Sequence, residues 1–522
     1  MSDTPRSTPI EARSRQSLYA FLAFLSAAFL TAGPVLMHLH LPLVDLPNHI
    51  ARHSIATASP GPMDVYYTYQ LKLVPNASAD LAWIATGGAM DPSRFSQLTM
   101  AFYCLAFIGS IMGLSRFLHG HWSPWPAAAS LVVFNACFFW GFQNFLVSVP
   151  FAILGLILWL WSERLPLTQR LLILSPFVLL LYVMHFFAFA TLAVTTFGRE
   201  IQRIAEAGKD WKSALLQASL LAIPYLIPIL WLLSDVLFGP ESPAGSKTSF
   251  GGLDSRLFVL TSISDGIFQA LPVALKLTGW AIALAIVLFA LTLLRKTGTA
   301  LSLSPKMRGP LTALAIAAIL SPTWLNGVAF VHVRFAFIAA ALLFASTEWR
   351  NLPLRKAQIL AAAILAILIL RGVAFERYAT NHTAETLDFI AATESIPAGE
   401  RLLPVYNHRA DGRDFRLWHI AANAVTYHQA FIPTLFQGVH ALQVKPQWAK
   451  HAIAAGAPAP VQFLDTDAAR GLPSMEFVWD WQDKFTYLVM LDSDRSTLAP
   501  YDQLEFITLK GRFSLYRING AT

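Results

Sequence analysis

Charged residues are distributed so that long stretches of the chain carry none. Between Gln16 and Val44, for example, there is no Asp, Glu, Lys or Arg. A helix needs only about 20 apolar residues to cross a bilayer, so the pattern predicts a mostly α polytopic membrane protein with about eleven transmembrane helices. The predicted membrane segments are residues 18–40, 96–118, 126–141, 144–162, 170–184, 186–198, 214–235, 272–294, 310–325, 332–347 and 357–374.

Two of the apolar stretches have awkward lengths. Residues 126–162 and 170–198, if each were a single helix, would put basic loops on both sides of the membrane. We interpret each as a hairpin of two short helices, with tips at residues 138–145 and 182–189 on the outer side. Short, broken helices occur in a membrane only where protein buries them or where they line a cavity. The tips therefore predict a cavity at the outer ends of the helices.

Basic residues fall mainly in the loops on one side of this arrangement. Short cytoplasmic loops are expected to be basic, which places the N-terminus in the cytoplasm and, with an odd number of spans, residues 376–522 outside. The sequence thus predicts a multi-pass protein of a bacterial inner membrane with a periplasmic C-terminal region. The formal net charge of +7 arises in the membrane part, so no nucleic-acid partner is predicted.

The last part of the chain has a different pattern. Apolar runs rich in β-branched and aromatic residues are bounded by polar or turn-forming residues, and an amphipathic helix is predicted at 384–396. The predicted strands are residues 400–406, 484–492, 504–510 and 512–518. We therefore predict a transmembrane domain at 1–375, with a first periplasmic loop at 41–95, and a soluble α/β or α+β periplasmic domain at 376–522.

The sequence lacks the common motifs for binding a nucleotide or a structural metal. It has no P-loop, no GxGxxG and no Cys/His spacing typical of a zinc site. Its two cysteines, Cys104 and Cys137, lie in apolar segments and give no disulfide framework. No cofactor is predicted, with a divalent metal left open.

The densest group of titratable residues is VDLPNHIARH, residues 44–53, which follows the first apolar segment. Asp45 is a favourable N-cap, and Pro47 is tolerated in a first helical turn. These signals predict a short helix over residues 46–58, lying on the outer face of the membrane.

Helical spacing aligns four side chains of this motif. Asp45, His49 and His53 are each four residues apart, and Arg52 lies three residues after His49. The resulting stripe gathers groups that exchange protons or bind anions. Three other interpretations stay open: Asp45 as a helix cap only, Arg52 as a residue that extends its charge to the interface, and His49 with His53 as metal ligands.

Further polar residues are predicted at the same depth. His185 is at the tip of the second hairpin, and Arg334, in FVHVRF, is at the outer end of a later span. A guanidinium group suits a phosphate because it can bind two oxygens at once. The alternatives are interface anchoring for Arg334 and a hydrogen-bonded core position for His185. Asp235, at the end of another span, competes with Asp45 for a catalytic role.

These features resemble the GT-C superfamily of integral-membrane glycosyltransferases, and its uncharacterised bacterial members more than its mannosyl- or arabinosyltransferases. The resemblance is architectural over the whole chain. Locally it rests on Asp45 in VDLPNHIARH, His185 in YVMHFFAF and Arg334 in FVHVRF. It implies inverting transfer of a sugar from a polyprenyl-phosphate donor to a lipid, glycan or protein acceptor at the outer face of the membrane.

The resemblance also implies roles for single residues. Asp45 would act as the general base that takes the acceptor's proton. The residues that would bind the sugar or the phosphate of the donor are His49, Arg52, His53, His185 and Arg334. Many members of the family have two adjacent acidic residues in this loop, whereas here Asp45 is followed by Leu46.

Two other functions fit parts of the pattern. A non-catalytic GT-C-like protein of envelope polysaccharide assembly would share the architecture and the large outer domain. A transporter or flippase would usually carry ionisable residues at membrane depth and repeated halves. The predicted spans hold almost no ionisable residues, and no repeat is evident, which disfavours transport.

Overall fold

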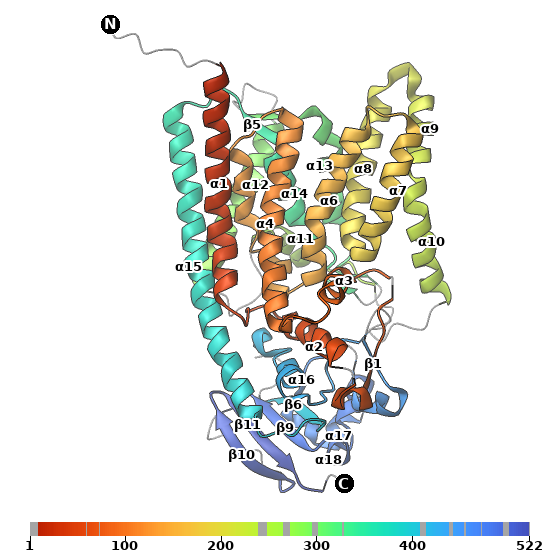
Figure 1. The fold of residues 1–522 in the computed structure, drawn as a ribbon, viewed down its shortest axis with the longest axis vertical. Helices are drawn as coiled ribbons and strands as arrows, with labels where there is room; N and C mark the ends of the chain where they lie inside the picture. The colour runs from red at the N-terminus through yellow and green to blue at the C-terminus, as the bar shows by residue number, and fades with distance from the viewer. Residues whose placement is uncertain are drawn as a thin grey trace.

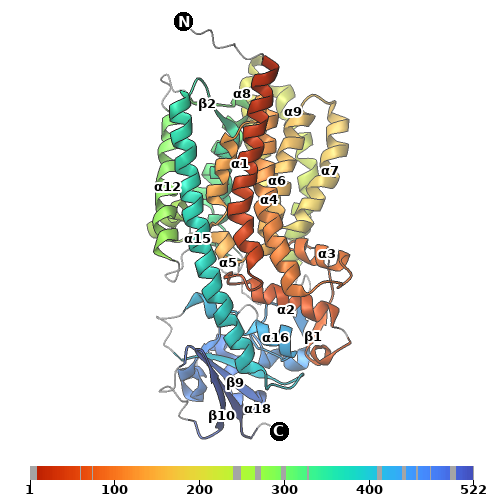
Figure 2. The same cartoon turned by 60° about the vertical axis from the view of Figure 1, so that its left-hand side comes forward.

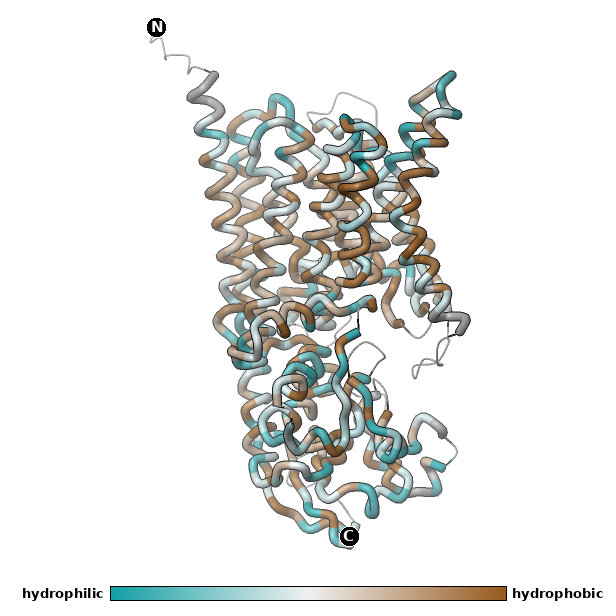
Figure 3. The backbone as a smooth tube through the Cα atoms, turned by 45° about the vertical axis from the view of Figure 1, so that its right-hand side comes forward, coloured by the Kyte–Doolittle hydropathy of each residue, from teal (hydrophilic) through white to brown (hydrophobic). Residues whose placement is uncertain are grey.

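The computed structural model describes residues 9–58, 60–72, 74–238, 248–264, 272–294, 301–325, 328–407, 414–437, 442–453, 456–470, 472–493 and 501–520. The chain forms a bundle of helices with a smaller domain at one end (Figures 1 and 2). We call this domain the end domain; it consists of the described residues between 394 and 520. Apolar residues dominate the bundle, whereas the end domain mixes hydrophilic and hydrophobic residues (Figure 3). The bundle is therefore the part suited to a bilayer.

Six helices in the described ranges are long and apolar enough to cross a membrane. They are α1 (Pro9–Met37), α4 (Pro92–His119), α6 (Gln143–Ser162), α7 (Leu167–Met184), α12 (Val273–Leu294) and α15 (Leu354–Thr393). A seventh span results if α9 (Trp211–Leu221) and α10 (Ile223–Phe238), which meet at a 42° bend, are counted as one. A mostly helical fold with about six helices able to cross a membrane is confirmed, and the count of eleven spans stays a prediction.

The other predicted spans correspond to elements that are shorter or more charged than these helices. The segment predicted at 126–141 is a 3-10 helix followed by a helix of one turn. The elements concerned are η2 (Trp125–Val132), α5 (Ala136–Trp140), α8 (Phe186–Glu206), α13 (Arg308–Leu320) and α14 (Val333–Ser346). One further short helix, α11 (Leu253–Thr261), lies outside the predicted spans. Both predicted hairpin breaks are present: the chain turns at Gly141 between α5 and α6, and at His185 between α7 and α8.

Short strands join some of these helices. They form two small antiparallel pairs, one between β2 and β5 and one between β3 and β4. Their bounds are β2 (Leu301–Leu303), β3 (Trp324–Leu325), β4 (Val328–Ala329) and β5 (Thr347–Trp349).

Helices α8 and α13 cross with their backbones almost in contact. A Cβ atom on Gly198 would overlap the carbonyl oxygen of Gly309, and a Cβ on Gly309 would overlap that of Gly198. Small residues at a crossing allow membrane helices to approach this closely. The two glycines therefore fix the distance between α8 and α13.

A buried arginine joins the ends of several broken elements inside the bundle. Arg371 of α15 donates hydrogen bonds to the carbonyl oxygens of Phe134, Ser264 and Leu275, and to the hydroxyl of Thr278. Phe134 lies in the loop between η2 and α5, and Ser264 follows α11. Leu275 and Thr278 lie in the first turns of α12. A bilayer supplies no water to such groups, so the guanidinium stabilises irregular backbone at membrane depth.

The end domain is built on a five-stranded sheet with the order β10-β11-β9-β6-β8. Its strands are β6 (Leu402–Tyr406), β8 (Ala459–Pro460), β9 (Tyr487–Leu491), β10 (Leu504–Lys510) and β11 (Phe513–Ile518). Strand β6 is parallel to β8 and β9, and β11 is antiparallel to β9 and β10. All residues of β6 and β9 are buried. Four of these strands match the predicted ones, which confirms a C-terminal sheet.

Short helices surround this sheet. They are η6 (Phe415–Leu417), α16 (Ala422–His428), η7 (Pro446–His451), η8 (Val461–Leu464), α17 (Thr466–Ala469), η9 (Pro473–Val478) and α18 (Trp481–Lys484).

Two connections attach the end domain to the bundle. Helix α15 continues without a break from the bundle to the sheet, so the helix predicted at 384–396 is its last part rather than a separate element (Figure 2). The loop between α1 and α4 also reaches the domain, because β1 pairs with β7. The elements involved are α2 (Leu46–Thr57), η1 (Pro62–Val65), β1 (Tyr67–Tyr69), α3 (Ser78–Ala85) and β7 (Leu442–Val444).

A network of charges reinforces the connection through α15. Arg512, beside β11, lies 3.3 Å from Glu385 of α15, 3.1 Å from Asp414 and 3.0 Å from Asp492. Arg416 lies 2.6 Å from Asp414 and 3.2 Å from Glu385. The last turns of α15 are thus paired with two separate segments of the end domain.

Candidate functional site

Asp45 lies where the bundle meets the end domain, one residue before α2. The amides of Val44 and Asp45 donate to the carbonyl oxygens of Phe139 and Trp140, at 3.1 and 3.0 Å. Gly141 adopts a left-handed conformation, with φ of 76°, and a Cβ there would lie 3.1 Å from the Asp45 amide nitrogen. Glycine suits both requirements. The tip of the first hairpin therefore positions the backbone of Asp45.

The Asp45 carboxylate is not used to cap α2. Asp45 occupies the N-cap position, but its side chain forms no capping hydrogen bond, so the interpretation of this carboxylate as a helix cap is wrong. Its Oδ1 lies 3.6 Å from Nε2 of His419, which belongs to the end domain. Helix α2 itself lies between the bundle and α16, with most of its side chains buried, rather than flat on an exposed face (Figure 1).

Burial sets the charge state of this pair. It raises the pKa of Asp45 to about 8, although the positive charge of Arg334 acts in the opposite direction. It lowers the pKa of His419 to about 3. At neutral pH the carboxyl group therefore retains its proton and the imidazole is neutral. A carboxyl group with a pKa near neutrality is suited to exchange a proton during a reaction.

Arg334 lies at the start of α14 among three aromatic rings. The centre of its guanidinium is 4.2 Å from the ring centre of Phe142, 4.7 Å from that of Phe187 and 5.2 Å from that of Phe145. The face of each ring attracts the positive charge of the guanidinium. One of its amino groups donates to the carbonyl of Ala329 at 3.4 Å. The side chain is only 6% exposed, so the interface-anchoring interpretation does not describe it.

His185 is brought next to Arg334 by shared neighbours. Its ring centre lies 5.2 Å from that of Phe145 and 6.0 Å from that of Phe187, and both rings also contact Arg334. His185 is the residue between α7 and α8, and its Nδ1 accepts a hydrogen bond from the amide of Phe187 at 3.0 Å. The residue thus has a capping role in addition to its place beside Arg334.

A series of aromatic rings extends from Arg334 to His419, the neighbour of Asp45. The Trp140 ring is 6.3 Å from that of Phe142 and 6.0 Å from that of Trp418. Trp418 stacks in turn on His419, with ring centres 6.0 Å apart. Trp140 and Phe142 come from the hairpin tip and Trp418 from the end domain, so both parts of the molecule contribute to one aromatic wall.

Several buried polar atoms beside this wall have no hydrogen-bond partner within the described residues. They are Nε of Arg334, Nε1 of Trp418, Nδ1 of His419 and both polar side-chain atoms of Gln143. Buried polar groups are nearly always paired, so a cluster of exceptions requires an explanation. A polar ligand would provide one. We call this region the junction site; its members are Asp45, Trp140, Phe142, Gln143, His185, Arg334, Trp418 and His419.

Arg52 and His53 belong to a second, separate cluster. Arg52 pairs with both carboxylate oxygens of Asp80 on α3, with distances of 2.8 and 2.9 Å. His53 Nε2 lies 3.7 Å from the same carboxylate, and the ring stacks on Trp83 at 5.4 Å. His49 Nδ1 is 3.2 Å from Arg52. The predicted stripe is therefore divided: Asp45 joins the junction site, and Arg52 and His53 tie α2 to α3. His49 contacts Arg52 within α2 and the Phe436 ring of the end domain.

The remaining residues of the two clusters differ in how far a local sequence pattern indicates them. Asp80 is a carboxylate in the otherwise apolar stretch ADLAWIA, a pattern that indicates a paired, buried charge. Trp418 and His419 carry no local signal, because only the contact between α2 and the end domain places them beside Asp45. The rival carboxylate Asp235 has a side chain outside the described residues.

The two histidines of α2 do not form a metal centre. In the described part of the chain, no group of three or more His, Cys, Asp or Glu could hold a metal ion. His53 faces Asp80, whereas the ring of His49 lies 6.2 Å from that of Phe436. The junction site itself contains one carboxylate, Asp45, beside His419, and a second imidazole, His185, beside the rings that contact Arg334.

The geometry of the junction site is the basis for inferring a function, because no protein-family model and no curated protein matches the chain.

Proposed function

We propose that the protein is an inverting membrane glycosyltransferase of the GT-C type. It transfers a sugar from a polyprenyl-phosphate donor to a lipid, glycan or protein acceptor. The observation that carries this proposal is the placement of one largely buried carboxylate, Asp45, within the electrostatic reach of one buried guanidinium, Arg334, along a wall of aromatic rings. These are the groups that transfer from a sugar phosphate requires.

The proposed reaction uses each group at a stated atom. The acceptor hydroxyl attacks the anomeric carbon while its proton passes to the Asp45 carboxylate, which acts as general base. The bond between the anomeric carbon and the phosphate oxygen breaks, and polyprenyl phosphate leaves with both electrons of that bond. Arg334 stabilises the charge that develops on the departing phosphate. Trp418 and Gln143 offer hydrogen-bonding groups to sugar hydroxyls, and the rings of Trp140 and Phe142 offer apolar faces.

The proposed location follows from the chain's charge pattern. Basic residues gather in the loops at the end of the bundle farthest from the end domain, where positive charge marks a cytoplasmic face. We place this end in the cytoplasm of a bacterial cell and the end domain in the periplasm. The junction site then lies at the outer face of the inner membrane, where a lipid-linked donor and an envelope acceptor meet.

The direct test is transfer of a labelled sugar from polyprenyl phosphate in isolated membranes. Replacing Asp45 by Asn keeps the shape of the side chain and removes the base, so we expect a loss of at least a hundredfold. The matched control is Asp254→Asn, which changes an exposed carboxylate on α11. We expect the control to retain full transfer.

Two results would redirect the proposal. Undiminished transfer by a folded Asp45→Asn variant would remove Asp45 from the reaction. No transfer by the unaltered protein, together with an envelope phenotype that survives Asp45→Asn but not deletion of the end domain, would favour a non-catalytic role in polysaccharide assembly.

A further inference from the structure

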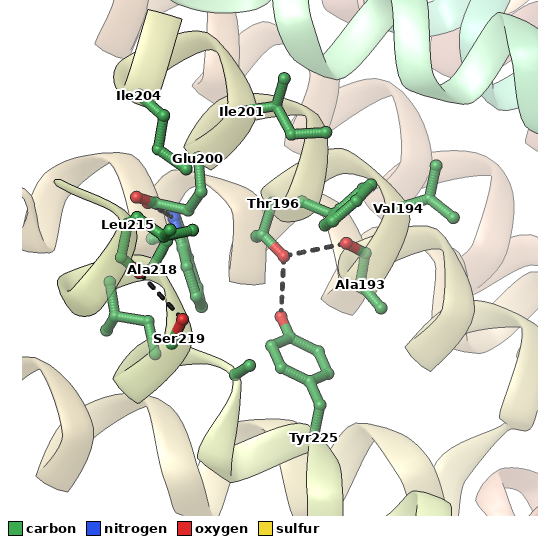
Figure 4. Close-up of a pocket in the computed structure, with 14 residues that line it drawn as sticks. Ala193, Val194, Thr196, Glu200, Ile201, Ile204, Leu215, Ala218, Ser219 and Tyr225 are labelled. Atoms are coloured by element: carbon green, nitrogen blue, oxygen red, sulfur yellow. Dashed lines mark hydrogen bonds between the residues drawn. The ribbon is translucent and has the colours of Figure 1, made fainter. Parts of the chain in front are cut away.

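A cavity of about 560 Å³ lies among α8, α9 and α10, away from the junction site (Figure 4). Its lining along α8 extends from Ala193 to Ile204, toward the end of the helix farther from His185. The bend between α9 and α10, at Ala222, forms part of the wall. Volumes of this size are typical of small-molecule sites.

The few polar groups in the cavity are already paired within the protein (Figure 4). The hydroxyls of Thr196 and Tyr225 lie 3.0 Å apart. Glu200 accepts a hydrogen bond from the Trp159 indole at 2.9 Å and lies 2.7 Å from Arg203. The remaining lining is almost wholly apolar. The cavity therefore suits a hydrocarbon and not a sugar or a phosphate.

The rim of the cavity is apolar and exposed. Phe197, Ile201 and Leu215 line the cavity and are 66%, 50% and 44% exposed. Large apolar side chains left uncovered on apolar helices face the acyl chains of a bilayer. The cavity thus opens sideways toward the hydrocarbon of the membrane, and a chain can enter it without crossing water.

Basic and aromatic residues lie just beyond one end of the cavity. Lys209 and Lys212 are exposed in the turn between α8 and the start of α9, where they outnumber the one exposed carboxylate between them, Asp210. The Lys212 ammonium is 5.9 Å from the ring centre of Trp211. Trp and Lys in this arrangement are typical of the level of lipid headgroups, and basic residues at that level attract anionic lipids.

We propose that this cavity binds one acyl chain of an anionic phospholipid, with the headgroup held near Lys209 and Lys212. The lipid comes from the leaflet opposite the end domain. This site is independent of the glycosyltransferase proposal, because it contains no residue of the junction site and needs no donor sugar.

The test measures lipid retention by native mass spectrometry of the full-length protein in detergent. The probes are palmitoyl-oleoyl phosphatidylglycerol and the corresponding phosphatidylcholine. The Ala218→Trp variant fills the cavity, and its matched control is Leu216→Trp, an exposed position on the same helix that does not line the cavity. A third variant, Lys209→Gln with Lys212→Gln, leaves the cavity open and removes the positive charge.

We expect the unaltered protein and Leu216→Trp to retain one phosphatidylglycerol with about tenfold preference over phosphatidylcholine. Ala218→Trp should retain neither lipid while keeping its thermal unfolding temperature in detergent, and the double lysine variant should bind both lipids equally. Equal retention of both lipids by the unaltered protein would overturn the headgroup assignment. Retention unchanged in Ala218→Trp, or preferential capture of polyprenyl phosphate, would overturn the site.

Discussion

At the scale of single residues, Asp45 illustrates how burial prepares a carboxyl group for chemistry. Burial of the carboxyl group raises its pKa, and this desolvation outweighs the attraction of the carboxylate to Arg334. His419, also buried, is neutral near pH 7 and adds no positive charge that would favour ionisation. Near pH 7 the carboxyl group of Asp45 therefore keeps its proton. A rise in pH removes this proton and produces the carboxylate, which is the proposed base.

The first prediction at this scale concerns the pH profile of transfer. Because the base is the ionised form of Asp45, and its pKa is raised to about 8, the active fraction should rise with pH. We expect kcat/KM, which reports the free enzyme, to increase about tenfold per pH unit up to roughly pH 8 and then level off. A profile that is flat between pH 6 and pH 8 would contradict the assignment.

Stability offers a check of the same pKa without substrate. Between the ordinary pKa of an aspartate and about 8, the folded protein binds one proton more than the unfolded protein at this position. Because the folded protein binds more protons, the free energy of unfolding decreases as the pH rises through that window. The unfolding temperature of the unaltered protein should fall relative to that of Asp45→Asn between pH 5 and pH 8, and a constant difference would contradict the shift.

At the scale of elements, the hydrophobic pattern predicted most of what is local. The turns at Gly141 and His185, helix α2, and strands β6, β9, β10 and β11 all follow from patterns within a few residues. Contacts between distant segments could not be predicted that way. The pairing of Arg52 with Asp80 and the approach of His419 to Asp45 depend on how α3 and the end domain pack against α2.

The crossing of α8 and α13 gives a prediction for one such packed pair. In Gly198→Ala, the added methyl would overlap the backbone of Gly309, and overpacking of this kind costs about 1–3 kcal/mol of folding free energy. The control is Gly113→Ala on α4, where the new Cβ would have its nearest neighbour at 3.9 Å. We expect Gly198→Ala, but not Gly113→Ala, to unfold at a lower temperature than the unaltered protein in detergent. Equal unfolding temperatures for both variants would show that α8 and α13 can move apart without loss of stability.

At the scale of the whole molecule, the junction site exists only because two parts are held in one arrangement. The hairpin tip supplies Trp140 and Phe142, the loop before α2 supplies Asp45, and the end domain supplies Trp418 and His419. The continuous α15 and its charge network set the position of the end domain relative to the bundle. The site should therefore respond to changes made far from its own residues.

Arg512 tests this dependence. Its partners are Glu385 on α15, Asp492 after β9, and Asp414, which lies five residues before His419 in the chain. In Arg512→Met, three carboxylates lose a shared cation, so the last turns of α15 and the segment carrying His419 should separate more easily. We expect faster amide hydrogen exchange in residues 380–393 and a several-fold loss of sugar transfer, although Asp45 and Arg334 are unchanged.

The control for this experiment is Arg470→Met, which breaks a pair with Asp480 on the open surface of the end domain, where both side chains are more than half exposed. Exposed pairs contribute little, so neither exchange nor transfer should change. If Arg512→Met accelerated exchange in α15 but transfer stayed at the level of the control, the end domain would not be part of the reacting site, and Asp45 would work with the bundle alone. A loss of both together would show that the charge network maintains the geometry in which a residue of the end domain faces the carboxylate of the membrane part.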